Sequence, residues 1–384
     1  MALPKFDLCA LPPEAERVRG EVREFLATEL ASMPRWKRAY TWMAFDGDFS
    51  RKVAARGWIG MTWPSLYGGR ERTAFERYVV LEEMLAAGAP VAAHWVGDRQ
   101  TGPMLLRRGT EEQRRRFLPL IASAEVFFCI GMSEPDSGSD LASVRTRATA
   151  VDGGWRVNGA KLWTSNAHRC RYMLALVRTQ PLAAAKHQGL SQLIVDLTGP
   201  GITIRPIRDL AGDAHFCEVV FEDAFVPGDF LVGEEGDGWK QVTSELAFER
   251  SGPERFLSCW PLIAEWTGEL ARSKTETAAE ADLGRQIAEL VTLRSMSIAV
   301  AGKLQAGEDP ALEAALVKDL GAVLEQRIPA VVQRHSPIEP RMDSAAGDLE
   351  HMLGLLTEIS PSFSLRGGTR EVLRGVIARG LGLR

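Results

Sequence analysis

The sequence predicts an α+β fold in which a β-rich block separates two helical blocks. Apolar residues recur at helical spacing over residues 12–123 and again from residue 240 onward. Residues 125–239 instead contain short apolar runs separated by Gly, Pro and Asp turns, which is typical of strands. Strands and helices grouped in separate blocks favour α+β architecture. We therefore expect an N-terminal helical domain (1–124), a middle antiparallel β-domain (125–239) and a C-terminal helical bundle (240–384).

Composition excludes several functional classes. The chain has 384 residues, is 45% hydrophobic and 25% charged, and carries a net charge of −4, so no nucleic-acid partner is expected. Five cysteines lie far apart with no Cys-x-x-Cys pair, which predicts reduced thiols and no metal site. No apolar run reaches the roughly 18 residues that a membrane span needs, and no apolar leader is evident. We therefore expect a cytoplasmic enzyme.

Helices are predicted most clearly at the start and the end of the chain. Residues 14–30 place their apolar side chains on one face, and residues 73–86 form a second helix. The last helix is predicted to begin near Thr369, which can cap it. Residues 88–106 mix small residues with His94 and Trp95, for which a tightly packed helix is the favoured interpretation.

The segment at residues 130–141 is the first candidate site. It reads Ile-Gly-Met-Ser-Glu-Pro-Asp-Ser-Gly-Ser-Asp-Leu and follows an apolar run, residues 126–130, that predicts a short buried strand. The Ser, Pro, Gly and Asp residues are typical of turns. Backbone N–H groups and hydroxyls with little side-chain bulk suit a flat ligand, and a plain surface loop is the alternative.

The second candidate site is at residues 154–166, which read Gly-Trp-Arg-Val-Asn-Gly-Ala-Lys-Leu-Trp-Thr-Ser-Asn. Asn158-Gly159 predicts a two-residue hairpin turn. The second arm would end in Trp163, a large π-face, followed by small hydrogen-bonding residues.

Together these two segments resemble the flavin-binding motifs of the acyl-CoA dehydrogenase family. The resemblance extends along most of the chain, through phrases such as residues 200–207, 221–227 and 236–239. It implies an acyl-CoA dehydrogenase-like fold, FAD as cofactor, and α,β-desaturation of an acyl-CoA thioester with hydride passing to flavin N5. It also implies that residues 88–106 line an acyl cavity whose small residues leave room for a bulky group. The cofactor-binding residues that it implies are Ile130, Met132, Ser133, Ser139, Trp163, Ser165, Thr369 and Glu371, with Ser139 shared by flavin and CoA.

The catalytic base departs from the common family pattern. Most members carry Glu just before Gly-Thr, but this sequence reads Arg366-Gly367-Gly368-Thr369, and glycine cannot accept a proton. A minority branch, similar to bacterial steroid side-chain dehydrogenases, places the base in a Leu-x-x-Glu-Arg pattern. Residues 246–250 match that pattern, so the resemblance assigns the base to Glu249 and a substrate-orienting role to Arg250. The alternative is a helix surface pair, and nearby Glu245 and Glu254 are expected to be solvated.

Two family segments that complete FAD sites between subunits are missing. There is no Arg-x-x-Phe-Gly segment, for which residues 283–287 are a poor substitute, and no Gly-Gly-containing Gln motif. A homo-oligomer, or a hetero-oligomer with a related chain that supplies these parts, is therefore implied, together with an electron-transfer flavoprotein as electron acceptor. Lipid or steroid catabolism is the implied setting. An acyl-CoA oxidase on the same fold, or a subunit with little activity alone, remains an alternative.

Overall fold

The computed structural model describes residues 4–181, 185–272, 277–343 and 345–383, without the side chains of residues 245–249. The chain divides into two compact units. Unit 1 comprises residues 1–44, 72–91 and 247–384, and unit 2 comprises residues 45–71 and 92–246. The predicted order of helical, β-rich and helical blocks is confirmed. The domain boundaries at residues 124 and 239 remain predictions.

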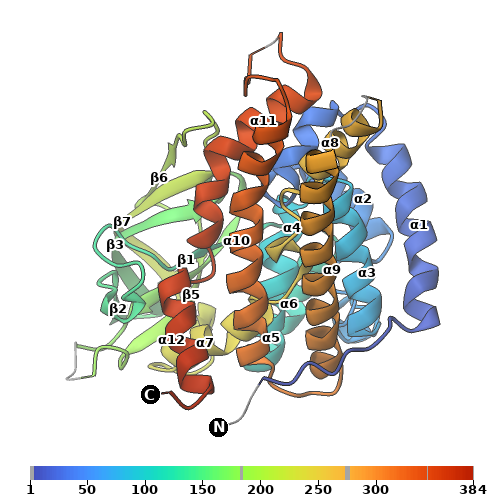
Figure 1. The fold of residues 1–384 in the computed structure, drawn as a ribbon. Helices are drawn as coiled ribbons and strands as arrows, with labels where there is room; N and C mark the ends of the chain where they lie inside the picture. Colours follow the sequence, from blue (N-terminus) through green and yellow to red (C-terminus); the bar gives the residue numbers. More distant parts are fainter. Residues whose placement is uncertain (1–3, 182–184, 273–276, 344, 384) are drawn as a thin grey trace. The chain divides into compact units, whose positions relative to one another are not determined.

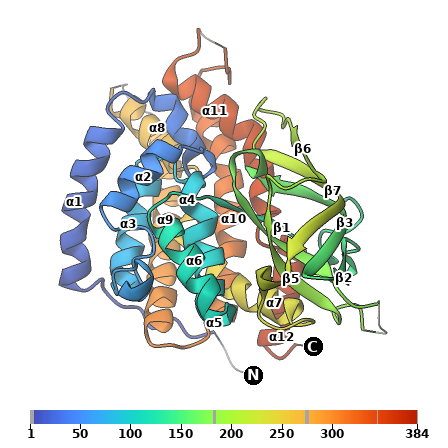
Figure 2. The same ribbon diagram turned by 180° about the vertical axis from the view of Figure 1, so that it is seen from behind.

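Unit 1 is helical. Its α-helices are α1 (Pro13–Glu29), α3 (Ala74–Ala86), α8 (Trp260–Arg272), α9 (Thr277–Gln305), α10 (Ala311–His335), α11 (Asp348–Ile359) and α12 (Arg370–Gly380), with 3-10 segments η1 (Arg35–Met43), η7 (Pro253–Arg255) and η8 (Ser360–Ser364). Figures 1 and 2 both show α9 and α10 running alongside each other. Ion pairs fasten α1 and α9 to α3, since Arg19 and Arg294 both bind Glu82.

Local chemistry explains where the predicted helices begin. Thr73 closes a capping box with Glu76 at the start of α3, which satisfies backbone donors that would otherwise lack partners. Thr369 caps α12 as predicted, with its hydroxyl accepting from the backbone N–H of Val372. Helix α1 matches the predicted helix at residues 14–30 to within one residue at each end.

Unit 2 combines short helices with one sheet. The α-helices are α2 (Gly47–Ala55), α4 (Ala92–Val96), α5 (Gly102–Arg108), α6 (Glu111–Ala122) and α7 (Gly238–Glu249), whose last residues belong to unit 1. A π-helical turn, η3 (Gly97–Thr101), joins α4 to α5. His94 and Trp95 are buried in α4, in agreement with the packed-helix interpretation, and Nδ1 of His94 lies 2.8 Å from Oγ of Ser50.

The sheet is mixed. Its strands are β1 (Phe128–Gly131), β2 (Arg147–Val151), β3 (Gly154–Ser165), β4 (Tyr172–Arg178), β5 (Leu190–Asp196), β6 (Ile202–Ile207), β7 (Phe216–Pro227) and β8 (Leu231–Val232). The order is β6-β7-β3-β2-β4-β5-β8, with β1 beside β4. Most pairs are antiparallel, as predicted for the β-domain, but β1 and β2 both pair with β4 in parallel, so the antiparallel prediction is wrong for these two pairs.

The predicted hairpin turn at Asn158-Gly159 is also wrong. Strand β3 continues through both residues, and its pairing with β7 shifts register between Val157 and Gly159. Gly159 has φ +139°, and a Cβ there would lie 2.8 Å from the Cα of Thr146. Glycine therefore allows the bulge in β3 and the close approach of the Thr146 backbone. The side-chain oxygen of Asn158 accepts from the backbone N–H of Asp223 on β7.

Among the described residues, no helix is both long and apolar enough to cross a bilayer.

Candidate functional site

The predicted cofactor residues of unit 2 lie on two neighbouring segments. One is the loop that leaves β1 at Gly131, and the other is the end of β3. The backbone N–H of Leu162 donates to the carbonyl of Ser133 at 2.8 Å, which joins the segments directly. A Cβ on Gly131 would lie 2.4 Å from Sδ of Met173, so glycine lets the loop approach the sheet closely. Ile130, Met132 and Ser133 are half-buried, so each retains some exposed surface.

A buried ion pair holds these segments together. Nζ of Lys161 donates to Oε1 of Glu134 at 2.8 Å and to the carbonyl of Met132 at 3.1 Å. Glu134 also accepts the backbone N–H groups of Arg145 and Thr146, at 2.6 and 2.9 Å. Two of these hydrogen bonds tie the start of the loop to Lys161 on β3, and the other two tie it to the residues just before β2.

Burial changes the proton affinity of both groups. It lowers the pKa of Lys161 to about 8, because the ammonium is fully buried and Glu134 restores only part of the lost solvation. Burial alone would raise the pKa of Glu134, but the Lys161 charge and the hydrogen bonds outweigh it and leave that pKa below its ordinary value. Both groups are therefore charged at neutral pH.

Trp163 stands out from the sheet at the end of β3. Its side chain is 55% exposed, and its φ is +60°, in the left-handed region. The pairing of β3 with β7 shifts register between Lys161 and Thr164, so Trp163 occupies a bulge. Its indole meets the ring of Phe216 edge-on at 5.8 Å. A bulky residue held in this conformation is strained, and such strain gathers at ligand sites.

These residues fit a planar, hydrogen-bonding ring system such as a flavin. Trp163 offers an exposed aromatic face, half-buried Ser165 offers a hydroxyl two residues later, and the loop at Met132 and Ser133 offers backbone and hydroxyl groups. An exposed indole can stack against a flavin ring, and the hydroxyl and backbone groups beside it can form hydrogen bonds with the ring's polar atoms. Among the described residues, no group of His, Cys, Asp or Glu could hold a metal ion.

Ser139 lies further along the same loop and is exposed. Its neighbour Asp140 is held from two sides: the hydroxyls of Ser137 and Ser143 both donate to the Asp140 carbonyl, at 2.8 and 2.7 Å. The loop is thus ordered by its own side chains even where it faces solvent.

Two of the predicted residues of unit 1, Arg250 and Thr369, lie beside Gly367 and Gly368. Arg250 is 6% exposed, and its Nε donates to the Gly367 carbonyl at 3.2 Å. Nζ of Lys318, also buried, donates to the carbonyl of Gly368. Glu249 is the last residue of α7, and its side chain lies outside the described residues. Two buried cations therefore fix the backbone of the Gly367–Gly368 turn before α12.

Thr369 and Glu371 follow this turn at the start of α12. Thr369 is the N-cap, and Glu371 is exposed in the first turn. Hydrogen bonds from its own backbone N–H and from the Thr369 hydroxyl lower the pKa of Glu371. A carboxylate at a helix N-terminus is also favoured by the helix dipole.

Sequence reasoning missed several buried charges. Lys161, Glu134 and Arg178 were not singled out, although a lysine within an apolar strand and a glutamate in a Ser/Gly loop were available signals. Glu254, predicted to be solvated, is 1% exposed beside Arg255, and that prediction is wrong because η7 turns the side chain inward.

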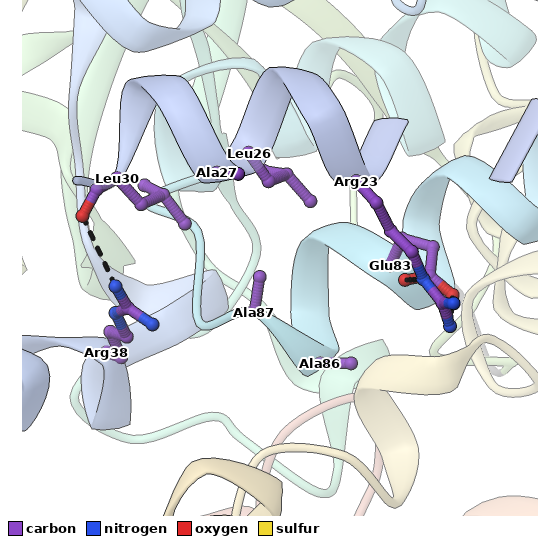
Figure 3. Close-up of a pocket in the computed structure, with 8 residues that line it drawn as sticks. All are labelled: Arg23, Leu26, Ala27, Leu30, Arg38, Glu83, Ala86 and Ala87. Atoms are coloured by element: carbon purple, nitrogen blue, oxygen red, sulfur yellow. Dashed lines mark hydrogen bonds and ion pairs between the residues drawn. The ribbon is translucent and has the colours of Figure 1, made fainter. Parts of the chain in front are cut away.

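Figure 3 shows a cavity within unit 1. It has a volume of about 310 Å³ and is lined by α1, α3 and Arg38. Nε of Arg23 binds Glu83 at 2.7 Å, and Nη2 of Arg38 donates to the Leu30 carbonyl at the end of α1. Both arginines are thus engaged within unit 1, and none of the predicted site residues lines the cavity.

Comparison with known proteins adds independent information. Residues 12–125 match the family model of the acyl-CoA dehydrogenase N-terminal domain, and residues 129–224 match that of the middle domain. The acyl-CoA dehydrogenase FadE29 of Mycobacterium tuberculosis is 32% identical over 383 residues, which cover 96% of this chain and 96% of that protein. FadE34 of the same organism is 32% identical over 377 residues, but the match covers 96% of this chain and 49% of that protein. The chain thus spans about half the length of FadE34.

Solved structures agree with these matches. The steroid ACAD Tcur3481–Tcur3483 superposes with a TM-score of 0.87 at 28% identity, covering 97% of this chain and 98% of that chain. The ChsE4–ChsE5 complex from Mycobacterium tuberculosis gives a TM-score of 0.83 at 30% identity, covering 98% of this chain and 99% of that chain.

Proposed function

Because this chain belongs to the acyl-CoA dehydrogenase family, we propose that it is an oxidoreductase that desaturates an acyl-CoA thioester between the α and β carbons, with FAD as cofactor. The observation that carries this proposal is Trp163: an exposed, strained indole beside Ser165 and the Met132–Ser133 loop, on the motifs that bind flavin in the family.

The flavin-holding residues divide by chemistry. Bound there, FAD would supply a two-electron acceptor for the hydride that leaves the β-carbon. Trp163 stacks against the ring system, and the Ser165 hydroxyl donates a hydrogen bond to it. Ile130, Met132 and Ser133 meet the ring from the loop after β1. Ser139 serves both flavin and CoA, while Thr369 and Glu371 bind near the adenylate half.

Glu249 is the proposed base that removes the α-proton. An α-proton beside a thioester is a weak acid, so the site must hold the base close and stabilise the developing enolate oxygen. Gly367 carries no carboxylate, which leaves this role to the glutamate that ends α7. Arg250 orients the site, because its buried guanidinium is fixed by the Gly367 carbonyl.

The substrate class and partners follow from the relatives. The structural neighbours include a steroid ACAD and a two-protein complex, which supports a lipid or steroid acyl-CoA substrate and assembly with a related chain. Homo-oligomerisation is the alternative assembly. An electron-transfer flavoprotein is the proposed acceptor of the electrons, and the enzyme is proposed to be cytoplasmic, as the sequence predicts.

The test is Glu249→Gln, assayed by anaerobic bleaching of the flavin absorbance with a panel of acyl-CoA thioesters. We expect the variant to retain yellow FAD and to lose bleaching and turnover. Glu235→Gln, an exposed glutamate just before α7, is the matched control and should behave as wild type. Wild-type turnover in Glu249→Gln would remove Glu249 from the mechanism. Wild-type protein that binds FAD only when mixed with a related chain would favour the shared-site assembly.

A further inference from the structure

Arg178 is a buried arginine whose partners among the described residues are backbone carbonyl oxygens. It ends β4 and is 8% exposed. Its Nε donates to Val144 at 3.2 Å, and its Nη2 donates to Ala142 at 3.0 Å. Nη1 donates to Gln188 at 2.9 Å, and Nη2 also donates to Lys186 at 2.9 Å. One guanidinium thus joins two chain segments, residues 142–144 and residues 186–188.

The first of these segments is the end of the loop that carries Ser139. The hydroxyls of Ser137 and Ser143 donate to the Asp140 carbonyl. Ser143 lies between Ala142 and Val144, the two residues of this segment that Arg178 binds. Nζ of Lys186 forms an ion pair with Asp140 at 2.9 Å, so the second segment also holds the loop at the residue after Ser139. Arg178 therefore binds both of the segments that hold the loop at Asp140.

Burying a cation costs free energy unless hydrogen bonds replace its hydration. Desolvation lowers the pKa of Arg178, and the negative charge of Glu134 offsets part of that shift. Backbone carbonyl dipoles replace the lost water in its hydrogen bonds. Only arginine presents donors in a fixed fork that can reach carbonyls on two segments at once.

We propose that Arg178 is a positioning residue that holds the Ser139 loop in the conformation that binds the CoA thioester. This inference rests on the proposed function, in which Ser139 meets CoA. Arg178 acts through the loop, to which its guanidinium binds by backbone carbonyls.

Arg178→Lys is the informative variant, because lysine keeps the charge but has a single nitrogen and cannot serve both segments. If the binding conformation then falls to about one tenth of the population, the apparent affinity falls about tenfold. We therefore expect KM for acyl-CoA to rise about tenfold, with kcat and the spectrum of bound FAD unchanged. A purely structural role would reduce the amount of folded enzyme but leave KM unchanged.

Arg171→Lys is the matched control. Arg171 lies just before the same strand and forms an exposed ion pair with Asp196, so its KM should stay at the wild-type value. Hydrogen exchange measured on full-length protein should accelerate about tenfold at residues 140–146 in Arg178→Lys and not in Arg171→Lys. Lys186→Met removes only the exposed ion pair with Asp140 and should raise KM by less than Arg178→Lys does. This variant also tests the proposal if Arg178→Lys does not fold.

The outcomes separate the two proposals. Three outcomes would overturn the positioning role. The first is an unchanged KM and an unchanged hydrogen-exchange rate in Arg178→Lys, and the second is an equal change of both in Arg171→Lys. The third is an Arg178→Lys variant that does not fold, together with a wild-type KM in Lys186→Met. If wild-type enzyme turns over no acyl-CoA, the proposed function fails, and the exchange comparison still decides whether Arg178 holds the loop.

Discussion

Replacing Lys161 with methionine tests the buried ion pair beneath the candidate flavin site. The substitution keeps a long apolar stem and removes the ammonium. It leaves Glu134 with two backbone N–H donors and without the cation that binds it directly, and it leaves the Met132 carbonyl without its Lys161 donor. The side chains are 0% and 7% exposed, so water cannot readily replace the lost partner.

The magnitude follows from this burial. Removing one partner of a buried pair costs about 3–5 kcal/mol, because the other charge stays buried without compensation. We expect Lys161→Met to lower the free energy of unfolding of unit 2 by about that amount. Adding Glu134→Gln should recover part of the loss, since the double variant buries no lone charge.

Urea unfolding followed by circular dichroism and tryptophan fluorescence measures the change. Lys186→Met is the matched control, because Lys186 forms an ion pair with Asp140 in which both side chains are about 60% exposed. Exposed pairs contribute roughly 0–1 kcal/mol. A Lys161→Met variant within about 1 kcal/mol of wild type would refute the argument from burial.

The same pair predicts a pH dependence. The pKa of Lys161 is lowered from 10.5 to about 8 in the folded protein. Between those values the unfolded chain binds more protons, so the unfolding free energy of wild type relative to Lys161→Met should rise with pH in that window. The lowered pKa of Glu134 gives a slope of the same sign at acid pH, because the unfolded chain again binds more protons: the contribution of Glu134 is present above the unfolded value of 4.5 and is lost as pH falls through the folded value. Unfolding curves from pH 3 to 10 check both signs, and a falling difference between pH 8 and 10 would contradict the first.

Substitutions at three further positions have expected outcomes. Gly131→Ala places a methyl group 2.4 Å from Sδ of Met173 and should lower the free energy of unfolding in urea by about 1–3 kcal/mol. An unchanged free energy of unfolding would show that the loop shifts to make room. Thr369→Ala removes the cap that accepts from Val372 and should cost about 0.5–2 kcal/mol, whereas Thr369→Ser should be near neutral. Trp163→Ala should change the stability of FAD-free protein by less than about 1 kcal/mol, because the ring is 55% exposed, yet weaken FAD binding in a fluorescence titration; unchanged affinity would exclude stacking on this ring.

The order of blocks and the helix starts could be predicted from the sequence because they depend on local chemistry. Periodicity over residues 14–30 and the caps at Thr73 and Thr369 act within one or two helical turns. The candidate flavin residues could be named because their motifs are contiguous. Their roles, and that of Glu249, remain proposals.

Other features could not be predicted because they depend on partners distant in sequence. Asn158-Gly159 has the local chemistry of a hairpin turn, yet β2 and β7 pair on both sides of it and convert it into a bulge. The parallel pairing of β1 with β4 joins strands more than 40 residues apart along the chain, as the register Phe128 to Tyr172 records.

The sequence by itself determined the family resemblance, the block order and the missing carboxylate at Gly367, all of which can be read from neighbouring residues. Only the tertiary structure decided that Lys161 binds Glu134, that Arg178 joins two loops, and that Arg250 holds the Gly367 carbonyl. The physical reason is that a buried charge is satisfied by whichever groups the fold brings within hydrogen-bond distance, and spacing along the chain does not specify those groups.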